Sequence, residues 1–228
     1  MSPVAPPRPA VHANCAISLD GRLAYAGGRR ARLSGPEDLE RVQQLRLASG
    51  AILVGVNTVL LDDPSLRVHY ELLGRKDEGR HPVRVVLDSR GRLPPQARVL
   101  DGSLPTIVAT SGANTTAYPK GVERIVCGTD RVELPRLLRE LSDRGIRRLL
   151  VEGGASVLSS FFRSGLVDRF TVYVAPVLIG GRTAPPLMGG PETAGPEGAV
   201  ALTRVAVEPL GEGVLLTFAP APGGHAPL

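Results

Sequence analysis

Apolar runs rich in β-branched residues alternate along this chain with segments of helical periodicity. This alternation is typical of a layered α/β domain rather than a helical bundle or a β-sandwich. The first run, residues 11–19, ends at the turn Asp20-Gly21, and residues 22–25 could form the return arm of a hairpin. Further strands are predicted at 51–56, 83–87, 106–110, 124–126, 147–152 and 168–174, with a closing antiparallel pair at 202–207 and 214–218.

Three helices are predicted from the spacing of apolar residues between these strands. The first covers residues 34–49, with Ser34 as the N-cap and Glu37 three residues later as its partner in a capping box. Leu39, Val42 and Leu45 give it an apolar face. The second covers residues 134–144 and is amphipathic. The third covers residues 154–164 and begins with small side chains.

A single domain is expected, because 228 residues with 43% hydrophobic content suffice for one sizeable core. The expected limits of this domain are residues 11–218. Residues 1–10 and 219–228 are rich in proline or glycine, and we expect both to be flexible segments. Residues 180–198 are predicted to form a long connection with the composition of a mobile loop.

The location of the protein is predicted from its hydrophobic runs and its two cysteines. No run of about 18 apolar residues occurs, and the start is not basic followed by apolar, so we expect neither a spanning helix nor a secretory signal. Cys15 and Cys127 lie in apolar stretches without CxxC spacing, which favours buried free thiols over a disulfide or a metal site. We therefore expect a cytoplasmic protein with no membrane partner.

The net charge of +5 raises the question of nucleic-acid binding. The basic residues are scattered among acidic ones, and four Phe and four Tyr offer few rings for stacking on bases. A nucleic-acid partner is therefore not expected. A net positive field still favours anionic, phosphorylated ligands.

The first candidate for chemistry is VEGGASVLSSFF, residues 151–162, where a strand passes directly into Gly153-Gly154 and then a helix. Glycines allow a phosphate to approach the backbone, and a helix N-terminus supplies free N–H groups with a favourable dipole. The motif is interpreted either as a pyrophosphate cradle or as a tight turn, and by itself it does not decide between them.

The second candidate is GVNTVLLDDPSL, residues 55–66. Thr58 and Asp62 are four residues apart, so on a helical turn they share a face and could hold a ribose or amide group by hydrogen bonds. The alternative is a helix start followed by a stop signal at Asp63-Pro64.

Two further groups of polar residues could contact a ligand. Asn14 and Ser18 point to one face of the first strand, where they could bind a ligand or form a structural polar pair. Arg46, Arg67 and His69 would suit a substrate phosphate if they converge, whereas the alternative is solvated surface charge.

The chain contains no recognisable set of a nucleophile with its base. GxSxG, HExxH, the P-loop and the full dinucleotide fingerprint are all missing from the sequence, and the four histidines are dispersed. We therefore predict no metal site and no catalytic side chain. In an enzyme of this kind a cofactor would carry the difficult step.

Six blocks, taken in order, resemble the pyrimidine reductases of riboflavin biosynthesis: SLDGR, SGPEDLERVQQLR, AILVGVNTVLLDDPSL, RVVLDSRGRLP, LLVEGGASVLSSFF and LVDRFTVYVAPVLIGG. This resemblance implies a three-layer dihydrofolate-reductase-like α/β fold with a central, mostly parallel mixed sheet flanked by helices, and a homodimer. It also implies hydride transfer from NADPH to C1′ of the ring-opened ribosylamino group of a pyrimidine 5′-phosphate, giving ribitylamino. Such a reaction depends on positioning and needs no covalent nucleophile.

The resemblance also implies roles for individual residues. Cofactor contacts are implied for Thr58, Asp62, Ser89, Gly153, Gly154, Ala155, Ser156, Val157 and Leu158. Substrate contacts are implied for Asn14, Ser34, Arg46, Leu66 and Glu152. Our hypothesis for the 5′-phosphate is Arg46 together with Arg67 or His69. The bacterial members commonly have Ser, Trp and Arg where this chain has Arg30, Arg32 and His69.

Two alternatives to this function stay open. One is a reductase of the same fold with a different imine or carbonyl substrate, because a shared cofactor frame does not fix the substrate. The other is a non-catalytic protein that binds nucleotides or nucleic acid. The zinc-deaminase pattern of the bacterial fusion does not occur in this sequence, so deamination is not expected. Whether the substrate is the diaminopyrimidinone or the deaminated uracil form is not decided by the residues.

Overall fold

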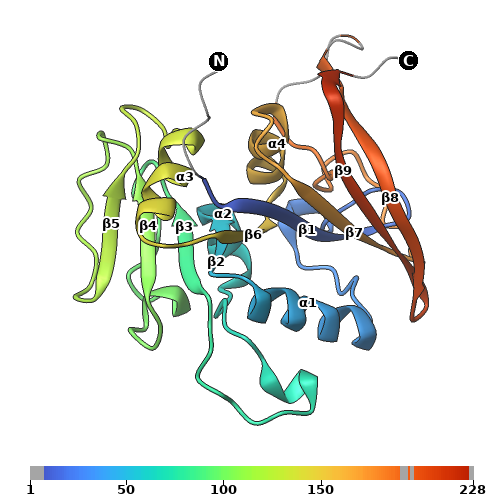
Figure 1. The fold of residues 1–228 in the computed structure, drawn as a ribbon, viewed down its shortest axis with the longest axis horizontal. Coiled ribbons are helices and arrows are strands. Elements are labelled where there is room, and N and C mark those ends of the chain that lie inside the picture. Colours follow the sequence, from blue (N-terminus) through green and yellow to red (C-terminus); the bar gives the residue numbers. More distant parts are fainter. Residues whose placement is uncertain (1–7, 191–194, 196–197, 226–228) are drawn as a thin grey trace, which may run out of the picture.

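The apolar runs form one nine-stranded sheet in the computed structural model, which describes residues 8–190, 195 and 198–225. The strand order is β5-β4-β3-β2-β6-β1-β7-β9-β8 (Figure 1). The strands are β1 (Ala10–Ser18), β2 (Ala51–Gly55), β3 (Val83–Leu87), β4 (Thr106–Thr110), β5 (Val122–Val126), β6 (Arg148–Gly153), β7 (Arg169–Ala175), β8 (Val200–Leu210) and β9 (Gly213–His225). Pairs from β5 across to β7 are parallel, and β9 pairs antiparallel with β7 and β8. This confirms the predicted mixed, mostly parallel sheet.

Helices cover both faces of this sheet and make the fold three-layered (Figure 1). The described α-helices are α1 (Pro36–Ala48), α2 (Val56–Asp62), α3 (Leu134–Asp143) and α4 (Ala155–Arg163). Short 3₁₀ turns are η1 (Ala26–Gly28), η2 (Tyr70–Leu73) and η3 (Arg98–Leu100). Because seven consecutive strands in the sheet are parallel, their carboxyl ends meet at one edge, the usual place for a ligand site in such folds.

The core has one layer on each side of the sheet, because side chains alternate along each strand. On one face, residues such as Leu53 and Val151 pack with the apolar side chains of α3 and α4. On the other face, Ile52 and Leu150 pack with residues of α2 and η3. All five residues of β2 are buried, as expected of a central strand that is covered on both faces.

The helix α1 differs from its prediction in its cap and in its buried face. It begins at Pro36 with Gly35 as the N-cap, and no side chain caps it, so the predicted Ser34–Glu37 capping box is wrong. The Ser34 hydroxyl instead donates a hydrogen bond to the Asp38 carboxylate. The fully buried residues of α1 are polar, Asp38 and Gln43, because they are satisfied by partners outside the helix.

Residues 22–25 do not form the return strand of a hairpin. Arg22 makes an isolated bridge with Pro186, and Ala24 makes one with Arg30. The Leu23 N–H donates to the Pro185 carbonyl at 2.9 Å. The segment therefore packs against the distant 180–190 region, a pairing that no local pattern predicts.

Both expected flexible ends are partly ordered. The Arg8 guanidinium donates to both carboxylate oxygens of Asp168 at 2.7 Å, which fixes the chain where it enters β1. Strand β9 continues to His225, so the expected domain limit at residue 218 is too early. Residues 1–7, 191–194, 196–197 and 226–228 lie outside the described residues, and the predicted mobility of the 180–198 connection stays a prediction.

Two expectations about the chain as a whole can be compared with the structure. Cys15 and Cys127 are free and buried, as predicted. Within the described part of the chain, no helix combines the length and the apolar character that crossing a bilayer requires.

Candidate functional site

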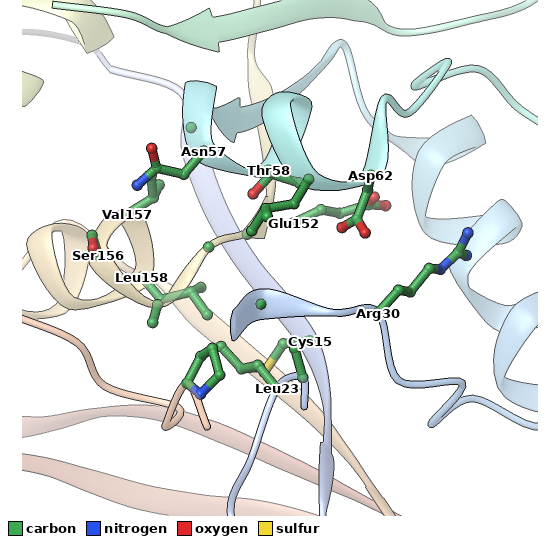
Figure 2. A pocket seen from close by; sticks show the side chains of 18 of the residues that line it. Cys15, Leu23, Arg30, Asn57, Thr58, Asp62, Glu152, Ser156, Val157 and Leu158 are labelled. Carbon is green, nitrogen blue, oxygen red and sulfur yellow. The ribbon is translucent and has the colours of Figure 1, made fainter. Parts of the chain in front are cut away.

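A cavity of about 950 Å³ opens at the carboxyl ends of β6, β2 and β3 (Figure 2). The last residues of these strands, Gly153, Gly55 and Leu87, all line it. Further walls come from β1, the segment that follows it, α2 and the start of α4. A second cavity, of about 270 Å³, lies between α4, β7 and β8 and is separate from this one.

The junction of β6 and α4 forms a glycine cradle on one wall of this cavity. Gly153 and Gly154 have φ angles of +140° and +79°, which favour glycine. A Cβ built on Gly154 would lie 3.1 Å from the Thr58 hydroxyl oxygen. The helix α4 begins at the next residue, so its unpaired N–H groups and dipole are available at the same place. All six predicted residues from Gly153 to Leu158 line the cavity, which fits a pyrophosphate held on backbone groups.

The helix α2 continues the cavity wall directly beside this cradle. Thr58 and Asp62 share one face of α2 and both line the cavity, as their spacing predicts (Figure 2). Burial raises the pKa of the Asp62 carboxyl, and the charge of Arg30 partly opposes this effect. A carboxyl in this setting can hydrogen-bond polar groups of a ligand that displaces water from the cavity.

Glu152 brings a carboxylate to the cavity wall next to the cradle, and Arg46 holds it from α1. The Arg46 guanidinium donates from Nη2 to Oε2 at 2.6 Å and from Nε to Oε1 at 2.9 Å, and from Nη1 to the Arg67 carbonyl at 2.7 Å. The two side chains are only 13% and 12% exposed. Burial is the largest single effect on the pKa of Arg46 and lowers it. The charge and the hydrogen bonds of Glu152 together outweigh burial, so the pKa of Arg46 is raised.

This geometry corrects the hypothesis for the 5′-phosphate. The donors of Arg46 are directed to Glu152 and a carbonyl. Arg67 pairs with Asp77 at 3.2 Å, with 41% of its side chain exposed, and His69 contacts Glu71 at 2.9 Å. Neither Arg67 nor His69 lines the cavity. The three side chains therefore do not converge on one anion site.

Ser34 and Asn14 belong to one polar network at the α1 side of the cavity. Ser34 lines the cavity, whereas Asn14 is 5% exposed and lies behind the lining. The Asn14 Oδ1 accepts hydrogen bonds from Arg41 and from Thr171, both at 2.8 Å. Ser18 is not part of this network, because its hydroxyl donates to Asp20 in the turn that follows β1.

Residues 9–216 match the family model described as the RibD C-terminal domain. The chain belongs to this family.

Relatives within the RibD C-terminal domain family are similar over most of the chain. The 2,5-diamino-6-ribosylamino-4(3H)-pyrimidinone 5′-phosphate reductase of Methanothermobacter thermautotrophicus is 45% identical over 189 residues, covering 80% of this chain and 85% of that protein. The protein of the same name from Archaeoglobus fulgidus is 40% identical over 219 residues, covering 92% of this chain and 97% of that protein.

Solved structures support the same fold. The RibD structure from Acinetobacter baumannii superimposes with a TM-score of 0.79 at 31% identity, and it covers 94% of this chain. This chain spans 58% of that longer protein. A dihydrofolate reductase from Enterococcus faecalis gives a TM-score of 0.51 at 15% identity, which concerns the fold alone. The predicted dihydrofolate-reductase-like fold is confirmed.

Besides Asn14 and Arg46, two more residues with implied ligand contacts do not line the cavity of this RibD C-terminal domain protein. Leu66 is 2% exposed, has a φ of +51° and packs in the core beside α2. The Ser89 hydroxyl accepts a hydrogen bond from the Val132 N–H at 3.0 Å and does not line the cavity. Within the same motif as Ser89, Arg92 does line it.

Several residues that line the cavity were not predicted from the sequence to be site residues. They include Cys15, Leu23, Arg30, Arg32, Asn57, Arg92 and Pro185. Asn57 adjoins Thr58 in the same motif and could have been found, whereas the contact of Leu23 with Pro185 is long-range. Burial raises the pKa of the Cys15 thiol to about 12, so this group stays neutral and is not an activated nucleophile.

Proposed function

We propose that this protein reduces the ribosylamino group of a pyrimidine 5′-phosphate to ribitylamino with NADPH, as a step of riboflavin biosynthesis. One observation carries the proposal: a single cavity joins the glycine cradle at α4 to the buried carboxylate of Glu152. The cradle suits a dinucleotide, and the carboxylate suits the N–H groups of a pyrimidine. The names of the two relatives described above agree with this substrate.

The cofactor would lie along the wall made by α4 and α2. Residues 153–158 would hold its pyrophosphate on backbone N–H groups, because a side chain at Gly154 would fill the space in front of Thr58. Thr58 and Asp62 would hydrogen-bond its ribose or amide groups. Arg92 is an exposed cation on the lining and would suit the 2′-phosphate that distinguishes NADPH from NADH.

The substrate would lie towards Glu152 and Ser34. Glu152 is held as an ion pair by Arg46, so its carboxylate is an acceptor fixed in position for N–H or O–H groups. Arg30 and Arg32 line the same cavity and supply positive charge for anionic ligands. Arg46 acts from behind the lining by holding Glu152, and Asn14 acts from behind it by holding Arg41.

Catalysis would depend on positioning. NADPH held there would supply a hydride for C1′ of the ring-opened substrate, and the adjacent nitrogen would take its proton from solvent water. The cavity walls would hold the two reactants next to each other. No side chain has to form a covalent bond, which agrees with the neutral thiol of Cys15.

The proposal is tested by following NADPH oxidation by absorbance with 2,5-diamino-6-ribosylamino-4(3H)-pyrimidinone 5′-phosphate, and in parallel with its deaminated uracil counterpart. We expect turnover of at least one of the two, and a lower kcat/KM with NADH. Dihydrofolate serves as the control substrate and should not react. NADPH binding without turnover of either pyrimidine would reject the substrate and favour a different imine or carbonyl compound.

Assembly and location are part of the same proposal. A homodimer is supported by the exposed apolar side chains of the outer strand β8, Val205 and Val207, which are 59% and 51% exposed. A cytoplasmic location is supported by the two free, buried thiols.

A further inference from the structure

Ser34 belongs to the cavity lining, and its hydroxyl hydrogen is directed to the buried carboxylate of Asp38. Ser34 lines the cavity just ahead of α1. Its hydroxyl donates to Oδ2 of Asp38 at 2.5 Å. A hydroxyl has one hydrogen and two lone pairs, so once the hydrogen is given to Asp38 the group can only accept further hydrogen bonds.

The orientation of the Asp38 carboxylate is fixed by burial and by hydrogen bonds to a second residue. Its side chain is 1% exposed. Its Oδ1 accepts two hydrogen bonds from Arg41, from Nε at 2.9 Å and from Nη2 at 2.7 Å. With Oδ1 committed to Arg41, only Oδ2 is available to Ser34. A buried ion pair of this geometry fixes both the position and the direction of its hydrogen bonds.

Arg41 is in turn fixed by the sheet. Its Nη2 also donates to Oδ1 of Asn14, which accepts the Thr171 hydroxyl as well. Because the Thr171 hydrogen is used in this way, the His12 Nε2, 2.9 Å from the Thr171 oxygen, must be the donor in that contact. Burial, together with the charges of Arg169 and Arg41, lowers the pKa of His12 to about 4, so the ring is neutral. The hydrogen bonds from His12 through Thr171 and Asn14 to Arg41 and Asp38 thereby each have a defined donor.

We propose that Asp38 is a positioning residue that makes Ser34 an obligatory hydrogen-bond acceptor, so that the substrate must present an N–H or O–H donor to it. This inference rests on the proposed function and adds to it a polarity requirement at one wall of the cavity. The donor is either the exocyclic amino group that the diaminopyrimidinone carries and the uracil form lacks, or a donor that the two compounds share. Ser34 then contributes to recognition in the same sense as Glu152, which is also an acceptor.

The test keeps the Ser34 hydroxyl but changes the direction in which it donates its hydrogen. In Asp38→Asn the amide oxygen stays with Arg41, because Arg41 offers only donors, and the amide N–H₂ turns towards Ser34. Ser34 then accepts from the introduced amide and directs its own hydrogen into the cavity, where it meets a substrate donor. We expect the KM for the pyrimidine to rise about 10- to 100-fold, with the KM for NADPH unchanged within about twofold.

A double-mutant cycle separates this role from a merely structural one. Ser34→Ala should raise the pyrimidine KM by a similar factor, and Asp38→Asn should add little more in the Ser34→Ala background. Glu40→Gln is the matched control, because it removes one negative charge from an exposed position of the same helix and should leave both KM values unchanged. Equal effects of Asp38→Asn with and without Ser34 would overturn the proposal.

Three further outcomes complete the experiment. If Asp38→Asn fails to fold, Ser34→Ala alone still decides, because an unchanged pyrimidine KM in that variant would overturn the proposal. The loss of affinity caused by Asp38→Asn is measured for both pyrimidines, as KM for the one that turns over and as Ki for the other. A larger loss for the diaminopyrimidinone identifies its exocyclic amino group as the donor to Ser34. Equal losses identify a donor that the two compounds share. No turnover by the unaltered protein would reject the proposed function and this inference together, whereas turnover with additive effects would reject the inference alone.

Discussion

Replacing Glu152 with alanine is expected to lower the free energy of unfolding by about 3–5 kcal/mol and to abolish turnover. The stability loss follows because Arg46, 13% exposed, would keep its charge without its carboxylate partner. The loss of turnover follows because Glu152 lines the cavity and is the proposed acceptor for the pyrimidine. Chemical denaturation measures the first effect, and NADPH oxidation measures the second.

Two control variants make this prediction specific. Glu123→Ala removes one of the two carboxylate partners of Arg144, from a 2.7 Å ion pair whose side chains are 30% and 48% exposed, and it should cost at most about 1 kcal/mol. The double variant Arg46→Met/Glu152→Leu removes both buried charges and should recover most of the stability but none of the activity. Full activity in the double variant would contradict the role assigned to Glu152.

Replacing Gly154 with alanine is expected to raise the KM for NADPH at least about tenfold, with a smaller effect on stability of about 1–2 kcal/mol. Gly154 has a φ of +79°, and the added Cβ would lie 3.1 Å from the Thr58 hydroxyl oxygen, in the space proposed for the pyrophosphate. Steady-state kinetics at varied NADPH concentration measures the effect.

Gly165 provides the matched control for backbone strain. It follows α4, has a φ of +62°, and a Cβ built there meets nothing within 4 Å. Gly165→Ala should therefore cost a similar amount of stability through its left-handed backbone, while the KM for NADPH stays unchanged. If both variants raised the KM alike, general strain rather than loss of the cradle would be the cause.

Much of the sheet could be predicted from the sequence, because its central strands are short apolar runs between Gly, Pro and polar residues. The segments 83–87 and 106–110 match β3 and β4. The last strand was predicted too short, since β9 continues through Pro220, where the apolar alternation gives way to Pro and Gly. Backbone pairing with β8 maintains this part of the strand.

The helix α1 shows where periodicity fails. Its apolar spacing at Leu39, Val42 and Leu45 predicts the buried face, yet Leu39 is 37% exposed and the fully buried positions are Asp38 and Gln43. Burial of these polar residues depends on partners elsewhere in the chain, such as the His69 N–H that donates to Gln43. A local pattern contains no information about such partners.

The candidate site was predicted best where its residues are close together in the sequence. Thr58 and Asp62 share a turn of α2, and Gly153 and Gly154 join a strand to a helix, so spacing alone indicated their geometry. The pairing of Arg46 with Glu152 joins residues 106 positions apart, and only the fold reveals it. This pairing is also why a phosphate site at Arg46 was the wrong hypothesis.

Isotope transfer tests most directly whether the cavity positions NADPH for hydride transfer to the substrate carbon. NADPH labelled with deuterium at C4 of the nicotinamide, as each of its two stereoisomers, is incubated with the protein and the pyrimidine phosphate. We expect that one stereoisomer gives a ribitylamino product with one deuterium at C1′ and that the other gives unlabelled product. Unlabelled product from both, or label at another carbon, would contradict it.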